Sequence, residues 1–269
     1  GGRKRVASLS ISTAWTETGR FLARHAGLVL PIAFLFIALP PVANALLLPA
    51  PDAPESADRA ILALFLTFAS LLANLIGGIA ISHLALVPGV SVGEALHRGL
   101  TRFLPLLGMC LLVVIPIIVL LAILLMIFLP DAGSIRGPQP PSLLFTIVII
   151  VAFVAIWTKF SMATPVAAKE PAGPVEILTR SWELTKGHYL KLFATFLAVT
   201  IVSWLLILAL SSGLGVLIFL VAGPPVFGSA SFVTITLLDT LLETIVLAVT
   251  AVLVARLYAQ LAEGEPETV

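Results

Sequence analysis

The chain has 269 residues, of which 59% are hydrophobic and only 11% are charged, and its mean hydropathy is +1.14. Soluble domains carry about 25% charged residues, so this composition excludes an ordinary water-soluble protein. The net charge is +1, and the Lys and Arg residues are dispersed, which argues against a nucleic-acid partner. The only cysteine, Cys110, leaves no intramolecular disulfide to form.

Six apolar stretches are each long enough to cross a bilayer as an α-helix, which takes about 20 residues. We expect these spans at residues 27–48, 60–86, 104–129, 142–167, 188–210 and 232–258. Prolines within them predict kinks. In the second span, Gly77 and Gly78 predict a close helix contact, and Asn74 predicts an interhelical hydrogen bond. The fold class is therefore an all-α polytopic membrane protein.

Three basic segments precede the first, third and fifth spans, at residues 3–25, 87–103 and 165–193. Each has the apolar and polar sides of a helix that lies flat on a membrane surface. The last of them predicts a helix that ends at Lys186, with Gly187 as a left-handed cap. Segment 211–231 differs, because it is uncharged and rich in Gly and Pro. We expect it to be an outer-surface or re-entrant segment.

The order of these elements repeats along the chain. Similar segments begin at residues 10, 91 and 174, a spacing of about 82 residues. Each copy holds a surface helix, an outgoing span, a turn-rich loop and a returning span. We therefore expect one membrane domain of three parallel helical hairpins. Their bounds are about 8–86, 87–167 and 168–260, with a polar tail at 261–269.

The distribution of positive charge predicts the orientation. Of the 15 Lys and Arg residues, only Arg59 and Arg136 fall on the connections at one side of the six spans. Cytoplasmic loops of membrane proteins carry the excess of Lys and Arg. Both termini are therefore expected in the cytoplasm.

One segment resembles a known family. Pro165 and Glu170 precede the run RSWELTKG at 180–187, and Tyr258 lies near the end of the last span. This pattern is similar to that of the YciC-like proteins and of the membrane domain of glycerophosphoryl diester phosphodiesterases. The resemblance implies a six-span protein of the bacterial inner membrane. It implies no enzyme, because the phosphodiesterase members carry their activity on a separate soluble domain, for which this sequence has no counterpart.

A group of basic and aromatic residues near the cytoplasmic surface forms the first candidate site. Basic clusters beside membrane spans bind the phosphates of anionic lipids. The alternative is that these side chains only anchor the helices, with Lys159 extending its ammonium to the head groups. The candidates are Lys159, Arg180, Trp182, Lys186 and Lys191.

Two acidic residues in the last span form the second candidate site. Asp239 and Glu243 are four residues apart and share one helical face. Acidic residues inside a membrane indicate a proton site, a cation site or a binding site for a polar substrate. One would then be protonated, or a cation would lie between them. The alternative is a wet outer vestibule, or hydrogen bonds to nearby Ser and Thr, with Arg59 or Arg136 as partners.

The sequence contains no Ser-His-Asp, Cys-His or HExxH arrangement, no phosphate-binding loop and no metal-ligand spacing. We therefore expect no enzyme, no cofactor and no metal. The leading hypothesis is an inner-membrane protein that binds, organises or moves lipid-like molecules, with anionic lipids of the cytoplasmic leaflet as partners. Two alternatives stay open. One is an accessory subunit of a larger membrane complex, and the other is a transporter coupled to protons or cations through Asp239 and Glu243.

Overall fold

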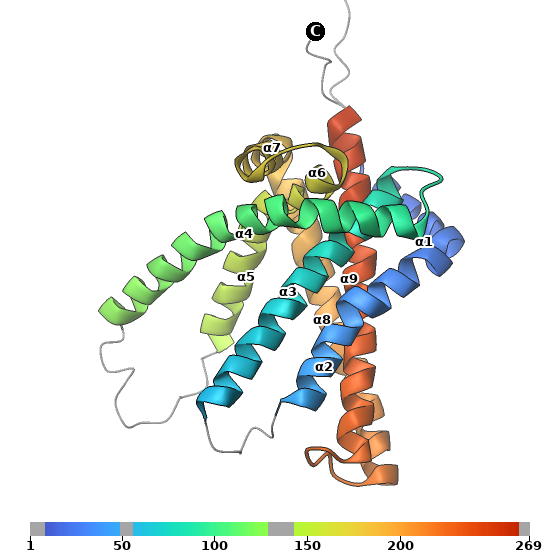
Figure 1. Ribbon diagram of the computed structural model, residues 1–269, viewed down its shortest axis with the longest axis vertical. Helices are drawn as coiled ribbons and strands as arrows, with labels where there is room; N and C mark the ends of the chain where they lie inside the picture. The colour runs from blue at the N-terminus through green and yellow to red at the C-terminus, as the bar shows by residue number, and fades with distance from the viewer. Residues whose placement is uncertain (1–8, 49–55, 129–142, 264–269) are drawn as a thin grey trace, which may run out of the picture.

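The computed structural model of the protein describes residues 9–48, 56–128 and 143–263. The regular elements within these ranges are all helices, and six helical segments are long and apolar enough to cross a membrane. The predicted all-α architecture with six apolar spans is confirmed. Figure 1 shows a bundle of long helices, with the short helix α7 (Pro174–Lys186) lying across one end.

The first span is the lower part of a long bent rod made of α1 (Ile11–Ala33), the π-helical turn η1 (Phe34–Ala38) and α2 (Leu39–Leu47). The backbone leaves helical geometry at His25, with φ −120° and ψ 17°. This bend lies where the predicted surface helix gives way to the predicted span. The π-helical turn lies between Pro31 and Pro40, and widened turns of this kind accompany kinks in proline-containing helices.

The second and third spans meet at one end of the bundle. Helix α3 (Ala57–Leu86) returns beside α2, where the Asn44 side chain donates to Ser70 Oγ at 3.2 Å. Asn74 was expected to bond between helices, but its side chain donates to the Ser70 carbonyl of its own helix. Helix α4 (Val92–Phe128) then joins the second surface segment and the third span into one 37-residue helix that continues through Pro105 and Pro116.

The fourth span is interrupted, which the sequence did not predict. Helix α5 (Leu143–Phe160) ends in a turn at Ser161 and Met162, and α6 (Ala163–Lys169) begins a new helix. Pro165 lies in the first turn of α6, the part of a helix where its missing N–H costs least. Helix α7 follows, as predicted. Its C-cap Gly187 has φ −84° and ψ −17°, so the expected left-handed cap was wrong.

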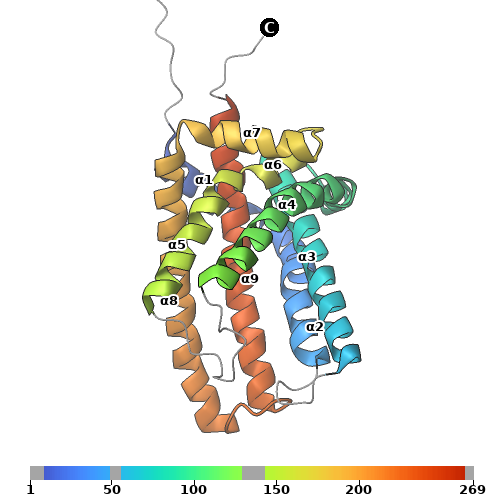
Figure 2. The ribbon, with the colours of Figure 1, turned by 90° about the vertical axis from the view of Figure 1, so that its left-hand side faces the viewer.

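The fifth and sixth spans form a long hairpin. Helix α8 (Tyr189–Ala222) has 34 residues and includes residues 211–222, so the expected re-entrant segment was wrong, while the outer-surface position of segment 211–231 stays a prediction. The chain turns at Gly223, whose φ of 81° favours glycine, and α9 (Ala230–Glu263) returns. Figures 1 and 2 show this hairpin reaching beyond the lower ends of α2 and α3.

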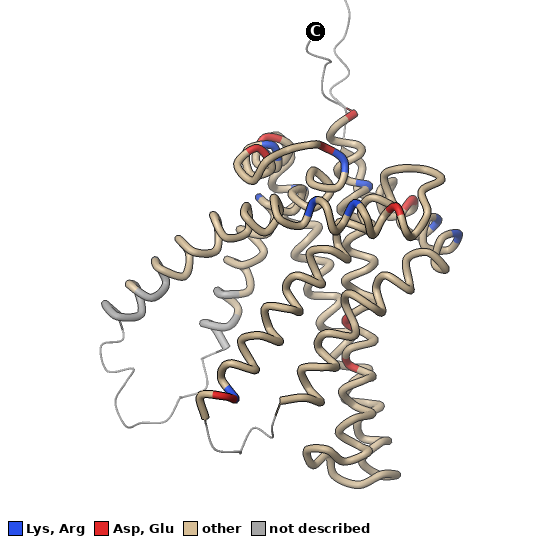
Figure 3. Tube along the Cα trace, in the orientation of Figure 1, with Lys and Arg blue, Asp and Glu red and all other residues tan. Residues whose placement is uncertain are grey.

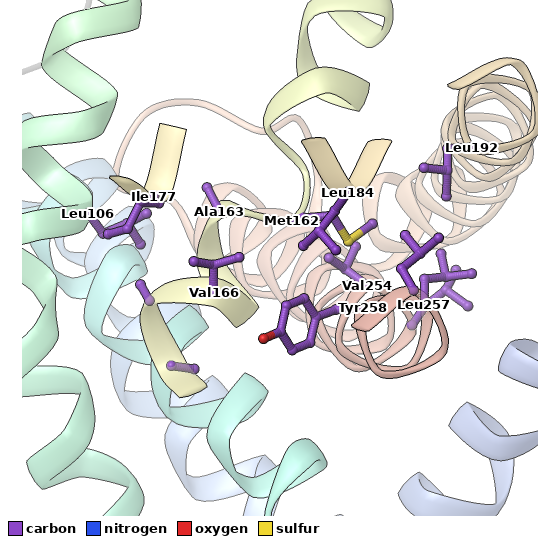
Figure 4. Close-up of a cluster of buried hydrophobic side chains, with 14 of the residues drawn as sticks. Leu106, Met162, Ala163, Val166, Ile177, Leu184, Leu192, Val254, Leu257 and Tyr258 are labelled. Carbon is purple, nitrogen blue, oxygen red and sulfur yellow. The ribbon is translucent and has the colours of Figure 1, made fainter. Parts of the chain in front are cut away.

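The packed core lies at the end of the bundle where α6 and α7 sit. Figure 4 shows its apolar side chains, with Met162 close to Val254 of α9. Helix α9 contributes to both buried clusters of the described chain. Lys and Arg gather at the same end, which we call the basic end, while Arg59 lies at the opposite end, at the start of α3 (Figure 3).

The described chain also begins and ends at the basic end. The backbone N–H of Ser10 donates to Gln260 Oε1 near the end of α9, at 3.0 Å. The six spans therefore return the chain to the side from which it starts. Which side is the cytoplasm, and whether the three hairpins are repeats, stay predictions.

Two glycines permit close helix contacts at the basic end. A Cβ on Gly77 would lie 2.7 Å from Phe36 Cβ, so the close contact predicted there is confirmed. A Cβ on Gly99 would lie 2.7 Å from the backbone oxygen of Ile76, which has less freedom to move. We expect Gly99→Ala to lower the free energy of unfolding by about 1–3 kcal/mol, as overpacking does.

The matched control for this substitution is Gly93→Ala in the same helix, where the nearest atom to the new Cβ is Ser91 Oγ at 4.0 Å. Alanine there should be neutral or stabilise α4 by up to about 1 kcal/mol. Thermal unfolding of both variants in detergent measures the difference. Equal changes of Tm in the two variants would contradict the close contact between α3 and α4.

Candidate functional site

The segment between α6 and α7 is held by two arginines of α4. The last four carbonyls of a helix, counted to its C-cap residue, have no partner within it, and here each receives a guanidinium hydrogen bond. Arg98 donates from Nε to the Ala168 carbonyl at 2.8 Å and from Nη2 to that of Lys169 at 3.3 Å. Arg102 donates from Nε to the Ala167 carbonyl at 3.3 Å. These bonds cap the end of α6.

Arg102 also fixes the chain beyond α6. Its Nη2 donates to the carbonyls of Glu170 at 2.8 Å and Ala172 at 2.6 Å. A planar guanidinium can serve several carbonyls in one plane, which a lysine ammonium does less well. The arginines therefore position the backbone that carries the Glu170 side chain.

The Glu170 carboxylate joins three helices. The Tyr258 hydroxyl of α9 donates to Glu170 Oε1 at 2.5 Å, and Arg180 Nε of α7 lies 3.4 Å from the same oxygen. Tyr258 is only 1% exposed, whereas the charged side chains of Glu170 and Arg180 are 29% and 28% exposed. The pair thus lies at the surface of the basic end, where it ties α6, α7 and α9 together.

A second polar arrangement surrounds Lys159 at the end of α5. Its Nζ lies 4.4 Å from the ring centroids of both Trp182 in α7 and Tyr189 in α8. Two hydrogen bonds fix these helices: Ser181 Oγ donates to the Lys159 carbonyl at 3.0 Å, and the Tyr189 hydroxyl donates to the Ala155 carbonyl at 3.1 Å. A cation above aromatic faces is attracted by about 0.5–2 kcal/mol. The lysine ammonium is therefore held at the junction of three helices.

An apolar groove lies between α4 and α5 and ends below α7. Its volume is about 600 Å³. Trp182 is on its rim and 48% exposed, and its ring centroid lies 6.4 Å from that of Phe160. Trp182 thereby connects the groove to Lys159. The lining residues are Leu112, Val113, Pro116, Ile117, Ile156, Phe160, Leu178, Thr179, Trp182 and Glu183.

The structure thus brings together some of the five lipid-binding candidates and separates others. Lys159 and Trp182 meet beside the groove, whereas Arg180 pairs with Glu170. Of the three lysines, none lines the groove itself; Lys159 contacts Trp182 of its lining, whereas Lys186 and Lys191 are exposed.

The two acids lie in the first half of the last helix. Because α9 begins at Ala230, Asp239 and Glu243 are about 14 Å and 20 Å from its start, at 1.5 Å per residue. The Asp239 carboxylate accepts a hydrogen bond from Ser211 of α8, while Glu243 is exposed. Arg136, one suggested partner, lies outside the described residues.

Several residues of the basic end had no predicted role. Arg98 and Arg102 are four residues apart, which places both guanidinium groups on one face of α4. That spacing is visible in the sequence, but their acceptors are backbone carbonyls about 70 residues away. Glu170 and Tyr258 are separated by 88 residues, and their hydrogen bond depends on how α6 meets α9.

No protein-family model, no curated protein and no solved structure matches this chain. The resemblance to the YciC-like proteins therefore stays a prediction.

Proposed function

We propose that this protein is a non-enzymatic protein of the bacterial inner membrane that binds a phospholipid. One acyl chain lies in the groove between α4 and α5, and the phosphate lies beside Lys159 and Trp182. The observation that carries this proposal is the meeting of an apolar groove with an aromatic-flanked ammonium at the basic end.

The lining of the groove suits a hydrocarbon chain. Most of its residues are aliphatic or aromatic, and Ile117 and Ile156 are exposed at its opening. A chain that moves from the bilayer into this groove gains little hydrophobic free energy, because lipid tails are as apolar as the protein surface. The contacts of the head group must therefore decide which lipid binds.

The head-group end of the groove favours a single phosphate. A lysine near the membrane surface attracts an anionic lipid by about 1 kcal/mol. The indole of Trp182 suits the interface, and the Thr179 hydroxyl is a further hydrogen-bonding group on the lining. Glu183 lines the same end, so its carboxylate disfavours a second negative charge.

Native mass spectrometry tests the proposal on protein extracted gently from vesicles of phosphatidylglycerol and phosphatidylcholine. We expect one retained phospholipid, with phosphatidylglycerol preferred. Lys159→Met should lower that preference about fivefold, the equivalent of about 1 kcal/mol.

The matched control is Lys186→Met, which removes a positive charge from the end of α7 but not from the groove. The preference for phosphatidylglycerol should survive in this variant. The proposal fails if no phospholipid is retained, or if the two variants reduce the preference equally, since a general charge effect would then explain it.

A further inference from the structure

A second pocket lies on the other side of α5 and has a different chemical character. It is formed by η1, α3, α9 and the turn between α5 and α6, and its volume is about 220 Å³. None of the described residues that line it is charged. Five of them carry a hydroxyl or an amide: Asn74, Ser82, Ser161, Thr164 and Thr250.

One residue of the lining, Ser82, carries a buried hydroxyl with no partner among the described residues. Ser82 is 1% exposed, and its Oγ forms no hydrogen bond with any described residue. A buried polar group that lacks a partner costs about 1–3 kcal/mol. Such groups call for an explanation, and an absent ligand is one.

The other polar side chains define which kind of ligand fits. Ser161 and Thr250 already donate their hydroxyl protons to backbone carbonyls, at 2.9 Å and 2.8 Å. Their oxygens keep free lone pairs and can only accept. Ser82 has both its proton and its lone pairs to offer. The pocket therefore matches a group that both donates and accepts, such as an alcohol, and it offers no charge to an ion.

The mouth of the pocket faces the bilayer. Asn74, Trp157 and Leu247 line it and are exposed, whereas Ser82 and Ser161 are buried. A cavity of about 150 Å³ admits a benzene ring, so this pocket has room for a small head group and the start of a chain.

We propose that this pocket binds the free hydroxyl of an uncharged lipid such as a diacylglycerol, which enters between α3 and α5. The hydroxyl donates to the oxygen of Ser161 or Thr250 and accepts from Ser82. The acyl chains extend past Trp157 into the bilayer. This site is separate from the phospholipid groove, and it does not depend on the function proposed for that groove.

Trp157 provides the test, because it is at the mouth of the pocket. The variant that keeps only Trp157 is placed in phosphatidylcholine vesicles and titrated with a diacylglycerol brominated on one chain, which quenches nearby tryptophan. We expect quenching to saturate at a mole fraction about tenfold lower than for a variant that keeps only Trp204. Trp204 is exposed on α8 and samples bulk lipid.

Three further comparisons test the roles of the hydroxyl and of the pocket. A brominated diacylglycerol whose free hydroxyl is acetylated should saturate the quenching only at a mole fraction about tenfold higher. It has lost the hydroxyl donor that the site pairs with. Ser82→Ala should weaken binding several-fold without lowering thermal stability, since it removes an unpaired group. Gly78→Ala should weaken binding too, because its Cβ projects beside Thr164 at an ordinary 3.6 Å contact.

The proposal is overturned if Trp157 and Trp204 follow the same quenching curve, or if the acetylated probe binds as well as the free alcohol. It is also overturned if Ser82→Ala and Gly78→Ala both leave the quenching curve unchanged, or if Ser82→Ala destabilises the fold. Quenching of Trp182 by phospholipid is a separate measurement. If the diacylglycerol proposal fails, the proposal of a phospholipid groove is therefore not affected.

Discussion

Arg102→Met is expected to lower the free energy of unfolding by roughly 3 kcal/mol, because three backbone carbonyls lose a charged donor at once. Methionine keeps most of the length of the side chain, so the loss reports the hydrogen bonds more than the packing. For a protein of this size, 3 kcal/mol corresponds to roughly 6–12 °C in Tm. Thermal unfolding in detergent, followed by tryptophan fluorescence, gives the shift.

Three further variants test whether the hydrogen bonds of Arg102 cause this loss. Arg98→Met removes two carbonyl contacts instead of three and should cost less. Arg20→Met removes an exposed arginine of α1 and should change Tm little. Arg102→Lys should restore only part of the lost unfolding free energy, because an ammonium cannot reproduce the planar set of N–H donors of a guanidinium. If Arg102→Met and Arg20→Met give the same Tm, the arginines do not hold the end of α6.

Ile156→Trp is expected to abolish phospholipid retention, with at least a tenfold loss for every head group. The residue is in the lining of the groove and exposed, so an indole at this position occupies the space proposed for the acyl chain. Because the effect is steric, it should be the same for phosphatidylglycerol and phosphatidylcholine. This distinguishes it from Lys159→Met, whose effect depends on charge. Native mass spectrometry measures both.

The matched control is Val202→Trp on α8, which adds the same side chain at an exposed apolar position away from the groove. Retention should stay as in the unmodified protein. A tenfold loss of retained phospholipid in Val202→Trp would mean that any bulky addition to the lipid-facing surface displaces lipid. The groove would then not be a specific binding site.

The long apolar runs predicted the existence of the six spans because every backbone group in a bilayer must be bonded within a helix. The same requirement explains the main error. Segment 211–231 was not expected to continue the span because it is rich in Gly and Pro, but glycine within a helix costs only about 1 kcal/mol. Exposing a backbone group to lipid costs more, so α8 continues to Ala222. The chain turns only where Gly223 is followed by two prolines.

The candidate site was predicted in part. The sequence singled out Lys159 and Trp182 because a lysine and a tryptophan near span ends are typical of the membrane interface. Their meeting depends on the turn at Ser161, which lets α7 lie over the end of α5. The pairing of Arg180 with Glu170 was not predicted, because the two residues are ten positions apart and the turn between α6 and α7 brings them together.

The most direct test of the phospholipid groove is the fluorescence of Trp182 in a variant that keeps no other tryptophan. Vesicles of phosphatidylcholine are enriched stepwise with phosphatidylglycerol brominated on one acyl chain, and a variant that keeps only Trp204 serves as the reference. We predict that quenching of Trp182 saturates at a clearly lower mole fraction of the brominated lipid than quenching of Trp204. Identical curves for the two tryptophans would contradict a phospholipid site beside Lys159.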